Sequence, residues 1–294
     1  MSTMDFLRPG TLAEALTMKA EHPEAVPIAG GTDVMVELNF DRARPEALLD
    51  LNRVTELTEH GTAGGRLRIG ASMPYSRIIG ELGEQLPGLA MAARTVGSPQ
   101  IRNRGSVGGN LGAASPAGDS HPALLTTDAE IELASVRGTR MVPAREFYLG
   151  VKRNALEPDE LITAVHLPPA EGPQQFCKVG TRNAMVIAVC ALSLAMRPAH
   201  REVAVAFGSA APTPRRVPDA ERFLAENLPW DSRTPLPETL TRRFGELVAQ
   251  ATQPIDDTRG SAAYRRHALA VLARRTLGWA WADHREGGQE CACG

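Results

Sequence analysis

Two glycine-rich segments contain the residue types that could hold an anionic group. The first lies within residues 26–38 (VPIAGGTDVMVEL). The second, residues 96–119 (VGSPQIRNRGSVGGNLGAASPAGD), contains six glycines and a single carboxylate, Asp119. Main-chain N–H groups can approach a ligand closely where side chains are absent, and glycine also permits φ > 0. Two such segments on one chain predict a large cofactor that is contacted at two places.

Neither segment matches a standard nucleotide-binding motif. The G-x-G-x-x-G pattern that follows the first strand of a dinucleotide-binding fold is missing, and so is the Walker pattern that ends in Gly-Lys-Ser/Thr. A glycine-rich turn by itself is often only a tight connection. The pair of segments therefore favours a cofactor site of a different kind from the Rossmann and P-loop sites.

The elements around the first segment would place its backbone at a ligand. A capping box at residues 11–14 predicts a helix over 11–20, and residues 25–29 are typical of a short buried strand that ends at Gly30 and Gly31. A second helix is expected over 33–38, with Thr32 or Asp33 near its N-cap. A strand, a glycine turn and a helix in this order direct N–H groups toward a bound anion.

The rest of the chain has a mixed pattern that predicts an α+β fold. A polar turn over residues 60–65 is expected to separate two strands, and the proline-rich segment 168–175 is the best candidate for a domain boundary. Three strands and then three helices are expected after it. The predicted strands cover 48–51, 67–71, 131–135, 161–167, 176–179, 188–196 and 202–208, and the further helices cover 76–82, 89–96, 219–226, 237–250 and 261–281.

Composition narrows the class of protein. A chain of 294 residues is long enough for two domains, and its formal net charge of -2 gives no reason to expect nucleic acid or an anionic membrane as a partner. No apolar run reaches the roughly 18 residues that a membrane span needs. The first ten residues, MSTMDFLRPG, do not resemble a secretory signal, so a cytoplasmic protein is expected.

The four cysteines do not indicate a metal site. Cys177 and Cys190 lie among apolar residues and are expected to be buried thiols. Cys291 and Cys293 belong to a polar tail that is expected to be flexible. Their two thiols alone do not complete a tetrahedral metal site, so metal binding by the tail is the less favoured interpretation.

Three longer motifs resemble one known family. AGGTD at 29–33, PQIRNRGSVGGNLGAASPAGD at 99–119 and FCKVGTRNAMVIA at 176–188 are similar to the FAD-binding medium subunit of molybdenum hydroxylases. This family includes the flavin subunits of xanthine dehydrogenase and carbon monoxide dehydrogenase. AFGSAAPTPRRVPDAERFL at 206–224 resembles the C-terminal domain of these subunits, and the similarity extends from about residue 3 to about residue 282.

The resemblance implies a fold with two domains. Residues 1–172 would form an FAD-binding domain of the vanillyl-alcohol-oxidase (PCMH) type, which consists of two α+β subdomains. Residues 173–282 would form a small α+β domain like the C-terminal domain of the carbon monoxide dehydrogenase flavoprotein, and residues 283–294 a flexible tail. Some members carry a cysteine-rich insertion for an iron–sulfur cluster, which is missing here, so no metal is expected on this chain.

The resemblance also implies which residues contact FAD. The first glycine loop would surround the diphosphate, with glycine at 30 and 31 leaving room for the ligand. Asp119 would accept hydrogen bonds from ribityl or ribose hydroxyls, and Lys178 would lie near the isoalloxazine. Ser106 and Ser98 stand where the family often has threonine and glycine. The complete implied set is Pro27, Ile28, Ala29, Gly30, Gly31, Thr32, Asp33, Val34, Val96, Ser106, Gly108, Gly109, Asn110, Ala113, Asp119, Ile162 and Lys178.

Several of these residues also have ordinary structural interpretations. Asn110 could cap the local backbone, and Lys178 could be an exposed lysine on a strand. Arg102 and Arg104 could reach a phosphate or form surface ion pairs. His121 has no nucleophile or carboxylate paired with it in the sequence, so a structural role is favoured over a catalytic one.

The function implied by the resemblance is electron transfer within a larger enzyme. A large partner would carry a molybdenum cofactor and a small partner 2Fe–2S clusters, and the subunits would assemble as a dimer of heterotrimers. FAD on this chain would deliver the electrons to NAD+ or O2. The substrate would be a purine, another N-heterocycle or an aldehyde, and this chain would need no catalytic side chain. A stand-alone FAD-dependent oxidase is the alternative, and an assembly factor that has lost FAD is a second one.

Overall fold

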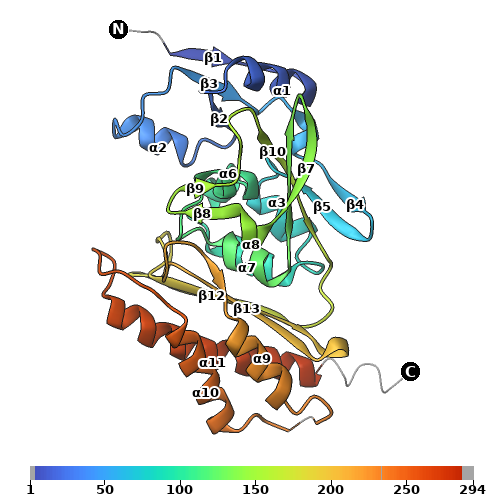
Figure 1. Ribbon diagram of the computed structural model, residues 1–294, viewed down its shortest axis with the longest axis vertical. Coiled ribbons are helices and arrows are strands. Elements are labelled where there is room, and N and C mark those ends of the chain that lie inside the picture. The colour runs from blue at the N-terminus through green and yellow to red at the C-terminus, as the bar shows by residue number, and fades with distance from the viewer. Residues whose placement is uncertain (1–3, 233, 287–294) are drawn as a thin grey trace. The chain divides into compact units, whose positions relative to one another are not determined.

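The computed structural model describes residues 4–232 and 234–286, which form two compact α+β units (Figure 1). The glycine-rich run of 96–119 is divided between them, since most of it belongs to unit 1 and Asp119 belongs to unit 2. Unit 1 comprises Met1–Gly80, Ser98–Ser115 and Asp128–Pro168, and unit 2 comprises Glu81–Gly97, Pro116–Thr127 and Pro169–Gly294. The domain limits at residues 172 and 282 stay a prediction.

The first part of unit 1 is a small parallel sheet with a helix. Its strand order is β1 (Asp5–Leu7), β3 (Ala47–Asp50), β2 (Val26–Ile28), and α1 (Leu12–Glu21) follows β1 in the chain. The predicted capping box is present: Thr11 Oγ1 accepts from the N–H of Glu14 at 3.2 Å. Ala15 of α1 and Leu49 of β3 belong to one buried cluster, so the apolar side of the helix covers the sheet.

The second part of unit 1 is a five-stranded antiparallel sheet. Its order is β4 (His60–Ala63), β5 (Arg66–Gly70), β10 (Leu161–Leu167), β6 (Glu130–Ser135), β7 (Gly138–Pro143). The prediction of a polar turn over 60–65 was wrong, because β4 occupies most of it and only Gly64 and Gly65, at φ +57° and +77°, form the turn. All four residues of β4 are exposed, which explains why this strand has no alternating apolar pattern.

Short helices and one hairpin complete unit 1. Two of the helices, α5 and α6, lie inside the glycine-rich run, for which the sequence predicted no helix. Their N-caps are Ser98 and Ser106, whose hydroxyls accept from main-chain N–H groups of the first turn. The elements are α2 (Val34–Asn39), η1 (Thr55–Leu57), α3 (Tyr75–Glu81), α5 (Pro99–Arg102), α6 (Val107–Ala113), α8 (Ala144–Phe147), β8 (Tyr148–Gly150) and β9 (Arg153–Asn154).

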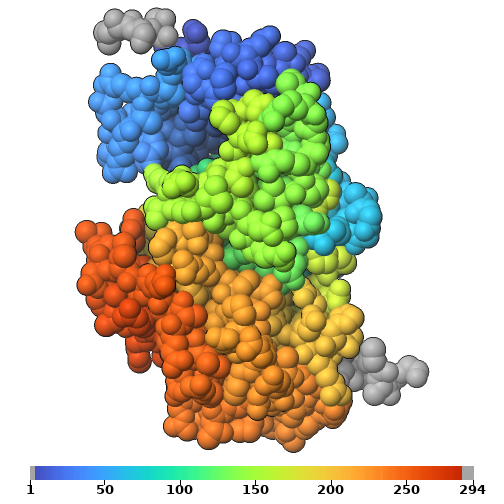
Figure 2. All heavy atoms as spheres, viewed as in Figure 1, coloured from blue at the N-terminus to red at the C-terminus, as the bar shows by residue number. Residues whose placement is uncertain are grey.

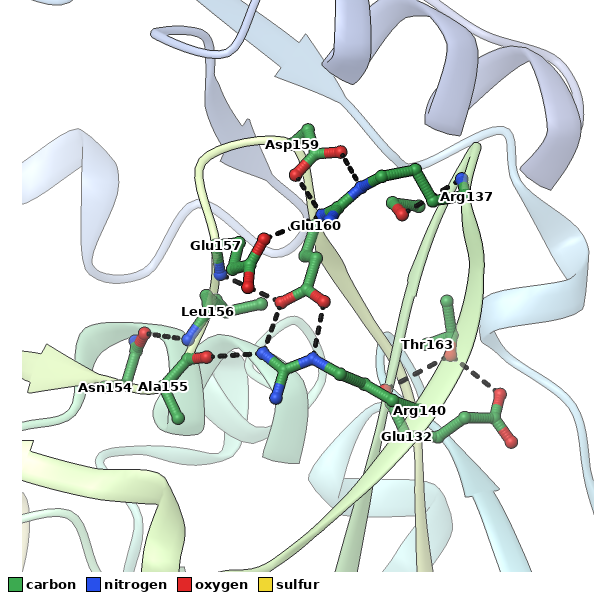
Figure 3. A network of polar contacts seen from close by, with 11 residues as sticks. Glu132, Arg137, Arg140, Asn154, Ala155, Leu156, Glu157, Asp159, Glu160 and Thr163 are labelled. Atoms are coloured by element: carbon green, nitrogen blue, oxygen red, sulfur yellow. Dashed lines mark hydrogen bonds and ion pairs between the residues drawn. The ribbon is translucent and has the colours of Figure 1, made fainter.

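A network of charged side chains fixes the connection between β9 and β10 to β7 (Figure 3). Arg140 of β7 donates two hydrogen bonds to the carboxylate of Glu160, at 2.6 and 2.7 Å, and a third to the carbonyl oxygen of Ala155 at 2.7 Å. Arg137 makes a similar pair of contacts with Asp159. Because Glu160 is only 5% exposed, this bidentate pair is better shielded from solvent than an ordinary surface ion pair.

Unit 2 contains a four-stranded antiparallel sheet with helices on both faces. The order is β11 (Gln174–Val179), β12 (Cys190–Arg197), β13 (Glu202–Gly208), β14 (Arg215–Arg216). On β12, Leu192 and Leu194 face the core under α9 (Pro218–Asn227), α10 (Glu238–Gln250) and α11 (Ala262–Glu286), which Figure 1 shows below the sheet. Ser193 faces the other way, 3.0 Å from Thr126 of α7 (Ser120–Thr126). Unit 2 also contains α4 (Pro87–Thr95) and η2 (Pro198–His200).

The predicted buried cysteines are both in unit 2. Cys190 is fully buried and Cys177 is partly buried, and burial raises their pKa values to about 12 and about 11. Both therefore stay protonated at neutral pH and are poor nucleophiles. Cys291 and Cys293 lie outside the described residues.

Neither a membrane span nor a metal cluster is found in the described ranges. Among residues 4–232 and 234–286, no helix has the length and hydropathy that crossing a bilayer requires. The same residues contain no group of three or more His, Cys, Asp or Glu side chains that could hold a metal ion.

Candidate functional site

The first glycine loop connects β2 to α2 and has unused hydrogen-bond donors. Gly31 adopts φ +73°, a conformation that favours glycine. In the part of the chain that the structure describes, the N–H groups of Gly30, Gly31, Thr32 and Asp33 donate no hydrogen bond to a protein atom. Backbone donors usually have partners, and a run of successive N–H groups forms a concave site that suits an anion. This loop is therefore suited to bind a diphosphate.

The second glycine loop uses most of its donors within the protein. The N–H of Gly108 donates to the carbonyl oxygen of Ala71 at 2.9 Å, and the N–H of Gly109 donates to Ser106 Oγ at 3.2 Å. The glycine content predicted that these two amides would approach an anion, but both donate to protein atoms. The Ser106 hydroxyl accepts one of these bonds and still has its own proton to donate, so it can contact a ligand while it caps α6.

The two glycine loops lie side by side in unit 1. An ideal Cβ at Gly30 would lie 1.9 Å from the carbonyl oxygen of Arg104, and one at Gly105 would lie 3.4 Å from Thr32 Oγ1. The expectation that glycine at position 30 makes room for the ligand therefore needs correction. Glycine is required there because the backbone of the second loop occupies the space that a side chain would need.

The glycines of α6 differ in their surroundings. An ideal Cβ at Gly108 would lie 2.6 Å from both the Cβ and the carbonyl oxygen of Ala71, whereas the nearest atom to one at Gly109 is Ser106 Oγ at 3.4 Å. Gly109 is exposed and Gly108 is buried. Gly108 therefore serves the packing of α6, and Gly109 faces open space in which a ligand can lie.

The remaining residues that the resemblance implies in unit 1 surround these loops. Asn110 and Ala113 belong to α6, and the N–H of Asn110 donates to the carbonyl oxygen of Ser106. Ile162 is buried in β10, where the pairing with β6 is irregular. Pro27 and Ile28 form the end of β2, directly before the first loop.

In unit 2, the predicted site residues Asp119 and Lys178 form a buried ion pair. Lys178 Nζ lies 2.6 Å from Asp119 Oδ2 and donates to the carbonyl oxygen of Thr95 at 3.0 Å, beside Val96 at the end of α4. The two side chains are 7% and 8% exposed, so the interpretation of Lys178 as an exposed strand lysine was wrong. Burial raises the pKa of Asp119, and the adjacent Lys178 ammonium opposes that rise.

The second carboxylate oxygen of Asp119 is an unsatisfied acceptor. Oδ1 is buried, and no described donor makes a hydrogen bond of normal geometry to it, although the nearby Thr95 hydroxyl acts to lower the pKa of the carboxyl group. Buried polar atoms are rarely left without a partner, and a carboxylate oxygen is a good acceptor for a hydroxyl. This atom fits the role that the resemblance implies, which is to bind a hydroxyl of the cofactor.

The side chains of Arg104 and His121 have surroundings that suit a role in the protein's own structure. Arg104 Nη2 donates to Asn52 Oδ1 at 3.0 Å on the surface of unit 1. His121 is completely buried in α7, which agrees with the structural role favoured from the sequence. The carbonyl oxygens of Ala71, Thr95 and Arg104 could not be found from the sequence, because main-chain atoms carry no residue-type signal.

Comparison with known proteins matches almost the whole chain to two family models. Residues 2–170 match the FAD binding domain in molybdopterin dehydrogenase, and residues 175–280 match the CO dehydrogenase flavoprotein C-terminal domain.

Individual relatives cover the chain from end to end. The xanthine dehydrogenase FAD-binding subunit of Escherichia coli O157:H7 is 34% identical over 280 residues, which are 92% of this chain and 93% of that protein. The carbon monoxide dehydrogenase structure from Hydrogenophaga pseudoflava has a chain with a TM-score of 0.88 and 27% identity, covering 96% of this chain and 98% of its own. Quinoline 2-oxidoreductase from Pseudomonas putida 86 gives a TM-score of 0.87 at 25% identity, with 95% and 97% covered.

Proposed function

The chain belongs to the family of FAD-binding subunits of molybdopterin dehydrogenases, and from this premise we propose that it holds FAD for electron transfer between a partner subunit and a terminal acceptor. The observation that carries the proposal is the first glycine loop, where the four N–H groups of residues 30–33 donate to no acceptor in the described part of the chain. These donors match the charge and the acceptor oxygens of the FAD diphosphate.

The proposal gives the other site residues distinct tasks. The Thr32 hydroxyl, which makes no hydrogen bond within the described residues, would donate to the diphosphate from the first loop. Ser106 and the open space at Gly109 would accommodate the ligand beside the second loop. In unit 2, Asp119 Oδ1 would accept a hydrogen bond from a cofactor hydroxyl, and Lys178 would keep the carboxylate ionised.

FAD supplies a group that takes up electrons singly and passes them on in pairs. The task of this chain is to bind and orient it. Lys178 would not present an unpaired cation to the flavin, because the Asp119 carboxylate lies 2.6 Å from its ammonium group. We therefore expect the pair to contribute a dipole and not a net charge as long as Asp119 is ionised.

The proposed partners are a large subunit with the molybdenum cofactor and a small subunit with 2Fe–2S clusters, assembled as a dimer of heterotrimers. The proposed acceptor is NAD+ or O2, and the substrate a purine, another N-heterocycle or an aldehyde. Relatives named as subunits of xanthine dehydrogenase, nicotinate dehydrogenase and nicotine 6-hydroxylase support the purine and N-heterocycle substrates, and one named as the medium chain of glyceraldehyde dehydrogenase supports the aldehyde.

The test compares the isolated chain with the complex purified from its native host. The isolated chain should bind FAD and leave its absorbance unchanged when xanthine, nicotinate or an aldehyde is added without air. The complex, in which molybdenum and iron are measured, should bleach the flavin with one of these substrates. Bleaching by the isolated chain would support a stand-alone oxidase instead, and failure of both preparations to bind FAD would refute the proposal.

A further inference from the structure

The hairpin formed by β8 and β9, residues 148–154, has a firmly anchored base. Phe147 and Tyr148 are buried and contact each other edge to face, with ring centroids 5.6 Å apart. The N–H of Ala155 donates to the carbonyl oxygen of Phe147 at 2.9 Å, and Arg140 binds the carbonyl oxygen of Ala155 (Figure 3). The two ends of the hairpin are therefore held together and fixed to β7, and this anchored base restrains the tip.

The tip of the hairpin binds the C-terminal end of α6. The N–H of Lys152 donates to the carbonyl oxygen of Ala114 at 3.1 Å, and Asn154 Nδ2 donates to the carbonyl oxygen of Gly112 at 3.0 Å. Both acceptors belong to the last turn of α6, whose carbonyl groups lack partners within the helix. The hairpin thus fixes the helix that begins with Ser106 of the second glycine loop, and Figure 1 shows β9 beside α6.

Lys152 also binds α2, the helix that follows the first glycine loop. Lys152 Nζ donates to Glu37 Oε1 of α2 at 2.8 Å, and this hydrogen bond lowers the pKa of the Glu37 carboxyl group. None of the residues of α2 is buried, so α2 has little packing of its own to hold it. In the view of Figure 2 the surface is recessed where the blue atoms of α2 approach the yellow-green atoms of the hairpin.

We infer that Lys152 is a positioning residue for FAD: its backbone fixes α6 and its ammonium group fixes α2, so that the two glycine loops keep the spacing that binds the cofactor. This inference rests on the proposed function. No motif marks Lys152, which takes a left-handed conformation at φ +53° and lies 115 residues from Glu37 in the chain. Its side chain is 60% exposed, so the ion pair should have a modest effect that salt can screen.

The experiment measures the rate of FAD release from the full chain by the recovery of flavin fluorescence, for the wild type and for Lys152→Met, Glu37→Gln and the double variant. Each single variant should release FAD about two- to fivefold faster at low salt, the range expected for one exposed ion pair. The double variant should release it no faster than the single ones, because both remove the same interaction. At 1 M NaCl the rates should converge with that of the wild type.

Two further variants control for general effects. Arg153→Gln removes a positive charge from the next position of the hairpin, where the described residues offer no ion-pair partner, and should leave the rate unchanged. Lys152→Arg should keep the wild-type rate. Wild-type rates for both single variants, additive effects in the double variant, or an equal acceleration by Arg153→Gln would overturn the inference. A wild-type chain that takes up no FAD would instead refute the proposed function.

Discussion

The two glycine loops of unit 1 look alike in the sequence but use their glycines differently. In the loop between β2 and α2, the backbone leaves four successive N–H groups without a partner among residues 4–232 and 234–286. In the loop that leads into α6, the N–H groups of Gly108 and Gly109 are bonded to Ala71 and Ser106, and Gly108 is packed directly against Ala71. The first loop thus offers free donors, which the proposed function assigns to an anion, whereas the second loop mainly holds a helix close to Ala71.

This difference shows that a glycine in a cofactor-binding loop can be required by the packing of the protein and not by contact with the cofactor. Gly30 belongs to the loop with free donors, yet the reason for glycine there is the carbonyl oxygen of Arg104. Gly109 belongs to the loop with occupied donors, yet among the described residues a Cβ there would meet only Ser106 Oγ, at an ordinary contact distance of 3.4 Å. The role of each glycine follows from its neighbours in space, and substitutions can separate the two roles.

The largest effect is expected at Gly108. Gly108→Val should lower the free energy of unfolding by about 3 kcal/mol, at the upper end of the range for overpacking, because the added carbons meet the backbone of Ala71. Urea denaturation of the FAD-free chain measures this change. A variant as stable as the wild type would show that α6 is not held closely against Ala71, and the contrast between the loops would then disappear.

A smaller effect is expected at Gly109, where substitution should weaken FAD binding and leave stability nearly unchanged. Gly109→Val should leave the stability of the FAD-free chain within about 0.5 kcal/mol of the wild type, since its Cβ has room. The Kd for FAD should rise at least about tenfold, equivalent to about 1.4 kcal/mol, because the side chain fills the ligand's space. Gly80→Val, at an exposed helical glycine with no atom within 4 Å of its Cβ, is the matched control and should bind FAD normally. Unchanged affinity in Gly109→Val would remove α6 from the site.

The smallest effects are expected when the hydroxyl groups of Ser106 and Thr32 are removed. Ser106→Ala removes the N-cap of α6 and should lower stability by about 1 kcal/mol. Thr32→Ala should leave stability unchanged and raise the Kd for FAD about fivefold, as expected for one lost hydrogen bond of about 1 kcal/mol. Thermal melting without FAD and titration with FAD measure the two quantities. Equal losses of stability in both variants would contradict the division of roles between the loops.

Local patterns in the sequence predicted most elements of the fold. The capping box at Thr11 and Glu14, the strand before Gly30 and the strands before the helices of unit 2 all agree with the structure, because each depends on neighbours in the chain. These patterns missed the short or exposed strands and helices, namely β1, β4, β7, β8, β9, β14, α5, α6, α7, α8, η1 and η2. The exposed strand β4 lacks apolar alternation, and the glycine content of the second loop concealed the serine caps of the two helices.

The resemblance supplied the site residues, but their physical roles depend on contacts between distant segments. Asp119 and Lys178 are 59 residues apart, and neither periodicity nor spacing could reveal that they neutralise each other. The same holds for the contact of Gly30 with Arg104 and for the ion pair of Lys152 with Glu37. Tertiary structure was needed to separate the residues that stabilise the loops from those that are free to bind a ligand.

Amide hydrogen exchange at single-residue resolution, with and without FAD, shows whether the N–H groups of residues 30–33 bind the cofactor. FAD should strongly slow the exchange of the N–H groups of residues 30–33. The exchange rate at Gly108, whose N–H is already bonded to Ala71, should change little. Bound FAD that leaves exchange over residues 30–33 unaltered would contradict the account.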